Sequence, residues 1–308
     1  MRPSHVFVTG GTGALGGHAV PALICAGHTV SALARTPRKA ELLRSQGARP
    51  VEVSLIDQAA LAECFLGQDV VVNLASALPP THRFVLRSAW KECTRIRTEG
   101  STAVVNAALE AGVPRLIQES VVMICADGGA DWVDERSAVD HFPIAVGNHA
   151  AEANARRFGD SGGTAVVLRF GLFYGPGAAH SEQIMRIARR HIGFRAGRRD
   201  SYMSSIHLED AASAVVAALH CPAGTFHIVD DEPVTAEDHA EAVGAAVGTH
   251  PWLGVPGRAA ALLGDRTTSM TRSLRVRNTR FRDATGWAPR YPSVREGYAQ
   301  MVGALGYR

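Results

Sequence analysis

Cysteines, long apolar runs and a strong charge of either sign are all scarce in this 308-residue sequence. The five cysteines are odd in number, widely spaced and free of any Cys-x-x-Cys pair, which argues against a disulfide framework and against a zinc site. No apolar run approaches the roughly 18 residues of a membrane span, and the few residues before Gly10 leave no room for a signal peptide. We therefore expect a cytoplasmic protein with no bound metal.

The charges nearly balance, since 32 Lys and Arg against 29 Asp and Glu give a net charge of +3. The arginines are scattered, whereas binding to nucleic acid or to an anionic membrane requires a dense basic patch. We expect neither of these partners, and a small-molecule substrate instead. With 46% hydrophobic residues, the chain can bury one large core, or a large core and a smaller lobe.

Short β-branched segments alternate with segments of helical period, and this alternation predicts the fold class. The expected strands are His5–Thr9, Thr29–Ala34, Pro50–Val53, Val70–Leu74, Arg115–Ser120 and Ala165–Phe170. Strands that alternate with helices form right-handed βαβ units, because only that crossover packs back onto a twisted sheet. The sequence therefore predicts an α/β protein with a Rossmann-type, doubly wound parallel sheet.

Further elements are expected on both sides of this pattern. The first helix should run from Ala14 to Ala26 and stop at Gly27, although Pro21 inside it removes a backbone hydrogen bond. Later in the chain we expect a helix near Ser181–His191, a strand near Ser204–His207, a helix over Glu209–Leu219 and an edge strand over Thr225–Val229. The basic stretch Arg266–Arg282 is expected to be a solvated surface.

A glycine-rich segment lies between the first expected strand and the first expected helix. It reads Thr9-Gly10-Gly11-Thr12-Gly13-Ala14-Leu15-Gly16. The first glycine of such a segment permits a tight turn, the second lets the backbone approach a pyrophosphate, and the third lets helix and strand pack closely. Free N–H groups at the helix start favour the phosphate charge. The segment predicts dinucleotide binding through Gly10, Thr12, Gly13, Ala14 and Leu15; the alternative is an ordinary glycine-rich turn.

The end of the second expected strand predicts which dinucleotide binds. A carboxylate there holds the ribose 2′-hydroxyl of NAD, whereas an arginine pairs with the 2′-phosphate of NADP. The sequence Leu33-Ala34-Arg35-Thr36-Pro37-Arg38-Lys39 contains no acid. It favours NADP over NAD, with Arg35 as the main contact and Arg38 or Lys39 in support; the alternative is a set of exposed charges at a helix start.

Several segments together resemble the extended short-chain dehydrogenase/reductase family, which includes nucleotide-sugar epimerases and dehydratases. They are the glycine-rich segment, Val72–Ser76, Leu168–Pro176, Ile206–Ala211, Gly286–Pro289 and Val294–Gly297. The resemblance implies a dinucleotide-binding domain over 1–170, to which 204–230 return, and a smaller substrate lobe formed by 171–203 and 231–308. It also implies a homodimer through two long helices near Arg83–Leu109 and Asn148–Phe158.

Further cofactor contacts are expected in these segments and at a few other positions. They are Leu55, Leu74, Ala75, Ser76, Asn148, Phe170, Gly171 and Phe173. Asn148 could hydrogen-bond the nicotinamide ribose, a role that needs no charge.

The Tyr-x-x-x-Lys pair that does the chemistry of this family is missing. The resemblance places Ile144 at the tyrosine position and Asn148 at the lysine position. No shift of the alignment restores the pair, because the tyrosines are at 174, 202, 291, 298 and 307 and the lysines at 39 and 91. Ser120 matches the serine that acts with them in the family; it could orient a carbonyl group, or its hydroxyl could be satisfied by nearby backbone.

Another group would have to replace the missing acid, unless the substrate or water does so. His149 and His141 are candidates because histidine titrates near neutrality, and Tyr174, Tyr202 and His207 could approach from the other side of the cleft; we name Ser120 and His149 as the catalytic candidates. An acidic segment around Trp132 (Asp127, Asp131, Asp134 and Glu135) is expected to be a solvated rim of the cleft.

Three functions fit these observations. The first is an NADP(H)-dependent oxidoreductase that acts on a small metabolite through a non-standard acid. The second is an NADP-binding sensor or scaffold without redox turnover. The third is a lyase, isomerase or epimerase that uses the cofactor transiently.

Overall fold

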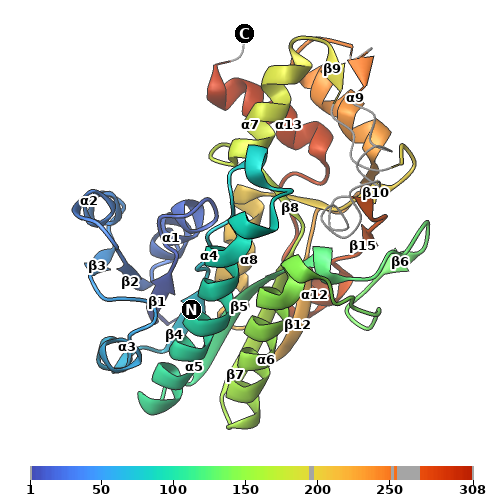
Figure 1. Cartoon of the computed structure of the whole chain (residues 1–308). Helices are drawn as coiled ribbons and strands as arrows, with labels where there is room; N and C mark the ends of the chain where they lie inside the picture. The colour runs from blue at the N-terminus through green and yellow to red at the C-terminus, as the bar shows by residue number, and fades with distance from the viewer. Residues whose placement is uncertain (1, 194–197, 251–252, 255–270, 307–308) are drawn as a thin grey trace.

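The computed structural model describes residues 2–193, 198–250, 253–254 and 271–306. Its centre is a seven-stranded sheet in which all paired strands are parallel (Figure 1). In spatial order the strands are β3 (Arg49–Val51), β2 (Thr29–Leu33), β1 (His5–Thr9), β4 (Val70–Asn73), β5 (Arg115–Val121), β7 (Thr164–Phe170) and β12 (Gly224–Ile228). This confirms the predicted Rossmann-type α/β fold, and each expected strand is present with ends that differ from the prediction by at most two residues.

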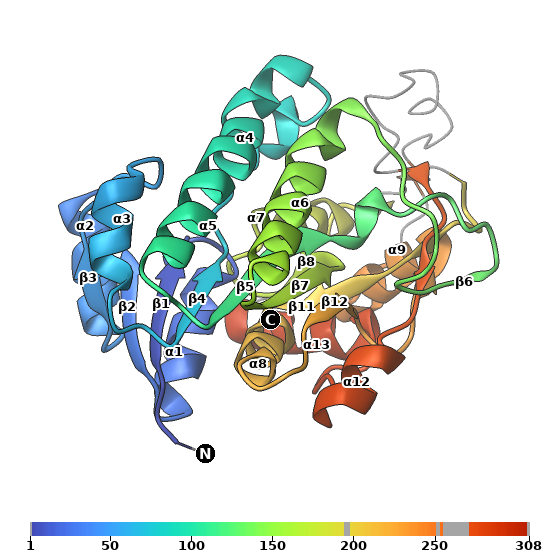
Figure 2. The ribbon, with the colours of Figure 1, turned by 90° about the horizontal axis from the view of Figure 1, so that it is seen from below.

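Helices cover both faces of the sheet, as Figure 2 shows in the view from below. One face carries α1 (Gly16–Cys25), α2 (Pro37–Ser45), α8 (Leu208–Ala218) and α12 (Thr279–Thr285), and the other carries α3 (Gln58–Phe65), α5 (Ser101–Glu110) and α6 (Val146–Asp160). Successive side chains of a strand point to opposite faces. Val6 and Val8 of β1 accordingly belong to the first core, whereas Phe7 packs in the second against Phe65.

The first helix ends where the sequence predicts, because Gly27 takes a φ of +89° that suits glycine. The helix also continues through Pro21, whose missing N–H leaves the Gly17 carbonyl without its helical donor. The Gln46 side-chain nitrogen donates to that carbonyl at 3.3 Å. A neighbouring helix therefore supplies the bond that proline removes.

The helix expected over Arg83–Leu109 is shorter than predicted. Two 3₁₀ turns, η1 (Thr81–Arg83) and η2 (Arg87–Trp90), precede α4 (Lys91–Arg95), and a π-helical turn, η3 (Ile96–Gly100), joins α4 to α5. A π turn changes the hydrogen-bond partners of the backbone. Around it, the Thr98 hydroxyl donates to the Thr94 carbonyl at 2.8 Å and the Thr102 hydroxyl to the Thr98 carbonyl at 2.9 Å.

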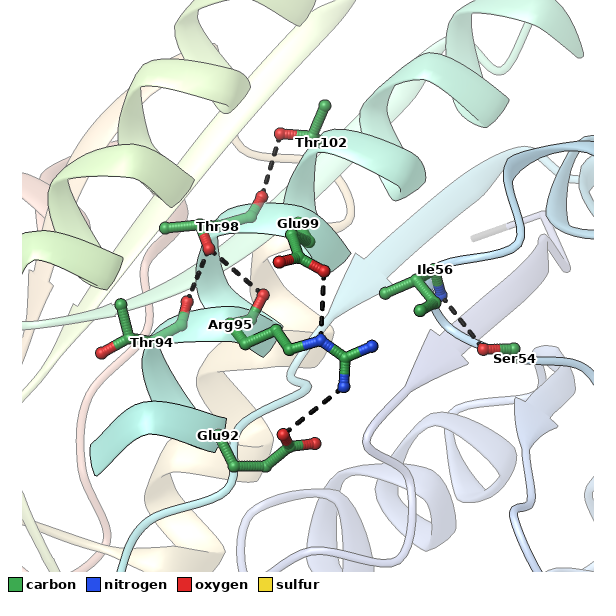
Figure 3. Close-up of polar contacts among 8 residues, drawn as sticks. All are labelled: Ser54, Ile56, Glu92, Thr94, Arg95, Thr98, Glu99 and Thr102. Carbon is green, nitrogen blue, oxygen red and sulfur yellow. Dashed lines mark hydrogen bonds and ion pairs between the residues drawn. The ribbon is translucent and has the colours of Figure 1, made fainter. Parts of the chain in front are cut away.

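Figure 3 shows the exposed side of this turn. The Arg95 guanidinium lies between Glu99, at 3.1 Å, and Glu92, at 3.5 Å. Gly100 lies on the inner side, where an added Cβ would come within 2.8 Å of a Leu55 methyl group. The π turn thus has charged residues outside and a close contact with the segment after β3 inside.

Beyond the sheet, three helices share a third core: α7 (Ala179–Ala188), α9 (Ala236–Ala246) and α13 (Val294–Leu305). Four pairs of short strands complete this part of the molecule. They are β8 (Leu172–Tyr174) with β11 (Ser205–His207), β10 (Tyr202–Met203) with β13 (Val234–Thr235), β9 (Ile192–Gly193) with β14 (Leu253–Gly254), and β6 (Trp132–Val133) with β15 (Arg275–Val276).

Several segments after residue 203 belong to the main sheet or pack on its core. The edge strand β12 joins the main sheet beside β7, and α8 packs on the core of that sheet. Within 231–308, α12 also belongs to the main core through Phe281, and Trp287 just after it does the same. No helix of the described residues is long and apolar enough to cross a membrane.

The basic stretch Arg266–Arg282 is a solvated surface only in part, and its first residues lie outside the described ranges. The Arg272 side chain is 7% exposed and pairs with Asp140 at 2.6 Å. Arg275 lies 4.3 Å from the ring centre of Trp132 and 4.8 Å from that of Tyr202. The expectation of simple solvation was wrong for these arginines because partners far away in the sequence cover them.

Candidate functional site

The carboxyl ends of β1 and β4 meet at the glycine-rich turn. Gly10 has a φ of +71°, and a Cβ on it would lie 2.5 Å from the Leu74 carbonyl oxygen. A Cβ on Gly16 would lie 2.2 Å from the Gly10 oxygen. Only hydrogen fits at either position, so the end of β1, the segment after β4 and the start of α1 pack closely at this turn. This is the geometry that a pyrophosphate requires.

The other residues expected to bind phosphate at this turn differ in their role and exposure. Gly13 closes it by donating its backbone N–H to the Gly10 oxygen at 2.9 Å. Leu15 is buried just before α1, while Thr12 and Ala14 are more accessible. The structure thus brings the residues predicted to bind phosphate into one turn.

A row of polar side chains fixes the strand ends next to this turn. The Thr9 hydroxyl donates to the Asn73 side chain at 2.5 Å, and the Asn73 amide donates to Gln118 at 2.8 Å. The Ala75 backbone N–H also donates to Asn73, at 3.4 Å. Leu74 and Ala75 are thereby held over Gly10, and Ser76 follows as an exposed residue.

The end of β2 presents exposed cations. Arg35 and Arg38 are exposed, and Thr36 caps α2 by accepting a hydrogen bond from the Lys39 backbone N–H at 3.3 Å. Partial burial and the nearby Arg35 charge lower the pKa of Lys39. Two cations that repel each other at a strand end make a place where an anion would be stabilised.

The remaining expected cofactor contacts fall into two groups, one at the end of β7 and one at the π turn. Phe170 is fully buried at the end of β7, with its ring centre 5.3 Å from that of Phe173. Gly171 lies between them, and a Cβ there would come within 2.8 Å of the Ser204 oxygen. Leu55 packs on the π turn at Gly100 instead.

Ser120 has a partner inside the protein. Its side chain is fully buried on β5, and its hydroxyl donates to the Glu152 carboxylate of α6 at 2.7 Å. Arg169 of β7 donates two bonds of 2.8 Å to the same carboxylate. Burial alone would raise the pKa of Glu152, but the bonds from Arg169 hold it below its ordinary value. The partner of Ser120 is therefore an ionised side chain and not the backbone.

His149 lies on a different side of α6 from the buried Asn148. Its Nε2 is 2.9 Å from the Asp140 backbone oxygen, and its ring stacks on His141 with centres 4.1 Å apart. Both rings therefore contact the segment that precedes α6. No contact joins His149 to Ser120 in the described part of the chain.

The other candidate proton donors are held elsewhere. Tyr174 is 1% exposed and donates to the Ser293 oxygen at 3.1 Å in the third core. His207 is fully buried and caps α8, and burial lowers its pKa to about 4. Tyr202 stacks with Arg275, which Trp132 covers from the acidic segment. This contact makes the expected cleft rim part of a packed cluster, although Trp132 remains 42% exposed.

The start of α6 is apolar where the resemblance implies a tyrosine. Ile144 is 8% exposed and belongs to a cluster with Trp90, Cys93, Ile124, Phe142 and Ala145. Burial raises the pKa of the Cys93 thiol, so that group stays protonated. One helical turn after Ile144, Asn148 is 6% exposed and its side-chain nitrogen has no hydrogen-bond partner among the described residues. The structure therefore places this apolar cluster, called the apolar wall below, next to the unpaired side-chain amide of Asn148.

A buried ion pair beside this wall was missed by the sequence reasoning. Arg97 of the π turn donates from Nη2 to the Glu119 carboxylate of β5 at 2.8 Å, and both side chains are almost fully buried. Burial raises the pKa of Glu119, while the Glu119 charge raises that of Arg97, which stays a cation. A sequence signal existed: Cys93, Arg97 and Val104 recur at helical spacing on the inner face.

Comparisons with known proteins agree with this geometry. The family model described as the NAD dependent epimerase/dehydratase family matches residues 6–228. A protein of a Streptomyces species named 3-diazoavenalumate denitrifying reductase is 32% identical over 311 residues, which cover 95% of this chain and 98% of that protein. A Stigmatella aurantiaca protein named 4-hydroxy-2-methyl-3-oxo-4-farnesyl-3,4-dihydroquinoline-1-oxide ketoreductase is 29% identical, with 84% and 79% coverage.

Among solved structures, the human epimerase family protein SDR39U1 (isoform 2), crystallised with NADPH, has a TM-score of 0.82. The two chains are 23% identical, and the match covers 97% of this chain and 99% of the human one. At this identity the match supports the fold.

Proposed function

Because the chain belongs to the NAD dependent epimerase/dehydratase family, we propose that it is an NADP(H)-dependent reductase whose substrate needs no proton from the protein. The family and the reductase names of its relatives support an NAD(P)-dependent, oxidoreductase-like function. The finer proposal depends on one observation above all. Ile144 and its apolar neighbours occupy the place where the family resemblance implies an acid.

The residues of the glycine-rich turn fit a dinucleotide. Gly10 and Gly16 permit a tight turn in which an added Cβ would clash with backbone atoms, and the first N–H groups of α1 lie at this turn. Gly10, Gly13 and the start of α1 would hold the pyrophosphate. Arg35 would hold the adenosine ribose, and the unused amide of Asn148 would donate to the nicotinamide ribose.

The preference for NADP is supported by the charges at the end of β2. Arg35 and Arg38 are exposed there with no acid beside them in the sequence, and the Arg35 charge adds to burial in lowering the pKa of Lys39. A 2′-phosphate would relieve this repulsion and accept a two-pronged arginine bond, whereas a 2′-hydroxyl would do neither.

The lack of an acid restricts the substrate. When bound, the reduced cofactor supplies a hydride; at a carbon that bears a diazonium group a C–H bond then forms, the C–N bond breaks and N₂ leaves, so that no proton is needed. The name of the Streptomyces relative describes such a denitrifying reduction of a diazo compound. The rings of Trp90 and Phe142 near Ile144 suit an aromatic or conjugated substrate. We therefore propose a diazo-bearing aromatic metabolite as the substrate class.

Ser120 and His149 remain predictions as catalytic residues, and their contacts favour positioning roles. The Ser120–Glu152–Arg169 network joins β5, α6 and β7 and so fixes the orientation of α6. The contacts of His149 fix the segment before α6. Neither residue is needed as a proton donor if nitrogen is the leaving group.

A turnover assay tests the proposal. The purified protein is mixed with NADPH and the diazonium salt of 4-aminocinnamate, with cinnamaldehyde as a parallel carbonyl substrate, and nicotinamide absorbance and N₂ release are followed. We expect consumption of NADPH with equal release of N₂. NADPH that binds but is consumed with neither substrate would contradict the proposal and favour the sensor function instead.

A further inference from the structure

We propose that Arg97 binds an uncharged oxygen of the substrate, a carbonyl or phenol oxygen, beside the carbon that accepts hydride. The inference rests on the proposed function, because it assumes that substrate and cofactor meet at the start of α6. It assigns the polar recognition of the substrate to a residue of the π turn.

The first argument is the state of the Arg97 side chain. It is 5% exposed, and only its Nη2 is used, in the bond to Glu119. Nε and Nη1 have no oxygen or nitrogen partner among the described residues, and the nearby Cys93 thiol, which contributes to the raised pKa of Arg97, is only a weak acceptor. Buried donors nearly always have an acceptor, because burial removes their hydrogen bonds to water and an unpaired donor gains no bond in return. An ion pair with Glu119 would need only one of the three guanidinium nitrogens of Arg97. The other two therefore indicate that a ligand supplies a further acceptor.

The second argument is the location of these donors. Glu119 follows Gln118, which belongs to the polar row that also holds Thr9 and Asn73 at the carboxyl edge of the sheet. Ligands of such sheets bind at this edge, across the point where the strand order reverses between β1 and β4. The cations at β2 mark the adenosine side, so the β5 side belongs to the nicotinamide and the substrate.

The third argument is the close approach of α6 to Arg97. A Cβ on Gly147 would lie 2.9 Å from the Arg97 Cβ, so α6 can approach only because this residue is glycine. The next residue is Asn148, whose amide nitrogen is also unpaired. Two unpaired donors on adjoining elements thus border the apolar wall around Ile144.

The chemistry of the guanidinium narrows the ligand. Arginine does not give up its proton, so it can donate hydrogen bonds to an oxygen without protonating it. The Glu119 carboxylate already lies against the guanidinium, which disfavours a second carboxylate and favours a carbonyl or phenol oxygen. Such a bond strengthens as negative charge develops on the oxygen, so Arg97 would stabilise charge where the family tyrosine would supply a proton.

The test uses 4-(dimethylamino)cinnamaldehyde, a conjugated aldehyde whose absorption band moves to longer wavelength when its carbonyl oxygen accepts a strong hydrogen bond. The aldehyde is titrated into protein saturated with NADP⁺, so that no turnover occurs. The decisive variant is R97L/E119L, which removes both charges and leaves no lone buried ion. E119Q keeps the guanidinium, and R95A is the matched control on the exposed side of the same helix.

We expect the red shift in the wild type, in R95A and in E119Q. In R97L/E119L the shift should vanish and aldehyde affinity should fall about tenfold or more, while NADP⁺ affinity stays within about threefold. An intact shift in R97L/E119L, no shift in the wild type, or an equal loss of NADP⁺ affinity would each overturn the inference.

If R97L/E119L does not fold, R97M/E119Q takes its place, because it also removes the guanidinium and keeps a side chain of similar length: loss of the red shift supports the inference, and a retained shift overturns it. The proposed function fails by a different result. Wild-type protein that binds no NADP⁺ in calorimetry would refute the cofactor assignment itself, whatever the aldehyde does.

Discussion

The two ends of the expected cofactor site are built differently. At the β1–β2 end, the glycine-rich turn and Arg35 lie in one short stretch of chain, and the cations are exposed. At the β5–α6 end, the polar groups come from four separate elements and are buried, as in the Arg97–Glu119 pair and the Ser120–Glu152–Arg169 network. The first end follows the family pattern, whereas at the second Ile144 lies in an apolar cluster, and the sequence contains no Tyr-x-x-x-Lys pair.

Under the proposed function, this difference separates cofactor binding at one end from the chemistry at the other. A backbone turn that holds phosphate serves any reaction that uses the same cofactor. The groups at the other end determine which acceptor can receive a hydride. The predictions below test the two ends against each other, in order of decreasing expected effect.

The largest effect is expected at the glycine-rich turn. In G16A, the added Cβ would lie 2.2 Å from the Gly10 oxygen, so the turn must shift and lose its bonds to phosphate. We expect NADPH affinity in calorimetry to fall about 1000-fold, or about 4 kcal/mol. G17A is the control, since nothing lies within 4 Å of its added Cβ. Equal affinity in both variants would show that the turn does not hold the cofactor.

The next largest effect concerns a buried histidine beside Arg169, at the β5–α6 end. His227 of β12 is fully buried beside Arg169, and burial, followed by the Arg169 charge, lowers its pKa from 6.5 to about 3. The unfolded chain binds a proton that the folded protein excludes, so stability falls as the pH drops from 6.5 towards 3. Between pH 7 and pH 4 this residue should account for about 3 kcal/mol of lost unfolding free energy.

Denaturant unfolding of H227L at the two pH values measures this contribution. We expect the difference between them to shrink by that amount, whereas H82Q, at an exposed position, should behave as the wild type. A difference that H227L leaves unchanged would mean that His227 is charged in the folded protein or is not buried.

A smaller effect is expected from the charges at the end of β2. R35A should weaken NADPH binding about 30-fold, or about 2 kcal/mol, and leave NADH binding unchanged, because only the 2′-phosphate pairs with the guanidinium. R44A is the control on α2, the helix that follows Arg35, where Arg44 pairs with Glu41 at the surface. Equal losses for both nucleotides would refute the preference for NADP.

The smallest effect is expected for the two residues named as catalytic candidates. H149Q should change kcat at pH 7 by less than about threefold, far below the loss caused by removal of a general acid. S120A should do the same if it stays folded, which circular dichroism would check. A loss of about 100-fold or more in H149Q with unchanged cofactor affinity would make His149 the missing acid after all.

The contrast between the two ends also explains how much of the structure could be predicted from the sequence. The positions of the main strands, the glycine-rich turn and the stop at Gly27 depend on contiguous residues whose backbone requirements are visible in the sequence. Arg97 and Glu152 escaped because a charged residue within a helix usually faces solvent. Their burial depends on Glu119 and Arg169, which other strands supply. The covered arginines Arg272 and Arg275 were misjudged for the same reason.

The most direct test of the central claim is the pH dependence of hydride transfer in a single turnover, with NADPH deuterated at the transferred position and the diazonium substrate. We predict a rate constant that stays level between about pH 6 and 9, with deuterium on the carbon that carried nitrogen. A rate that follows the titration of one group, or a product without deuterium, would contradict hydride transfer without a protein acid.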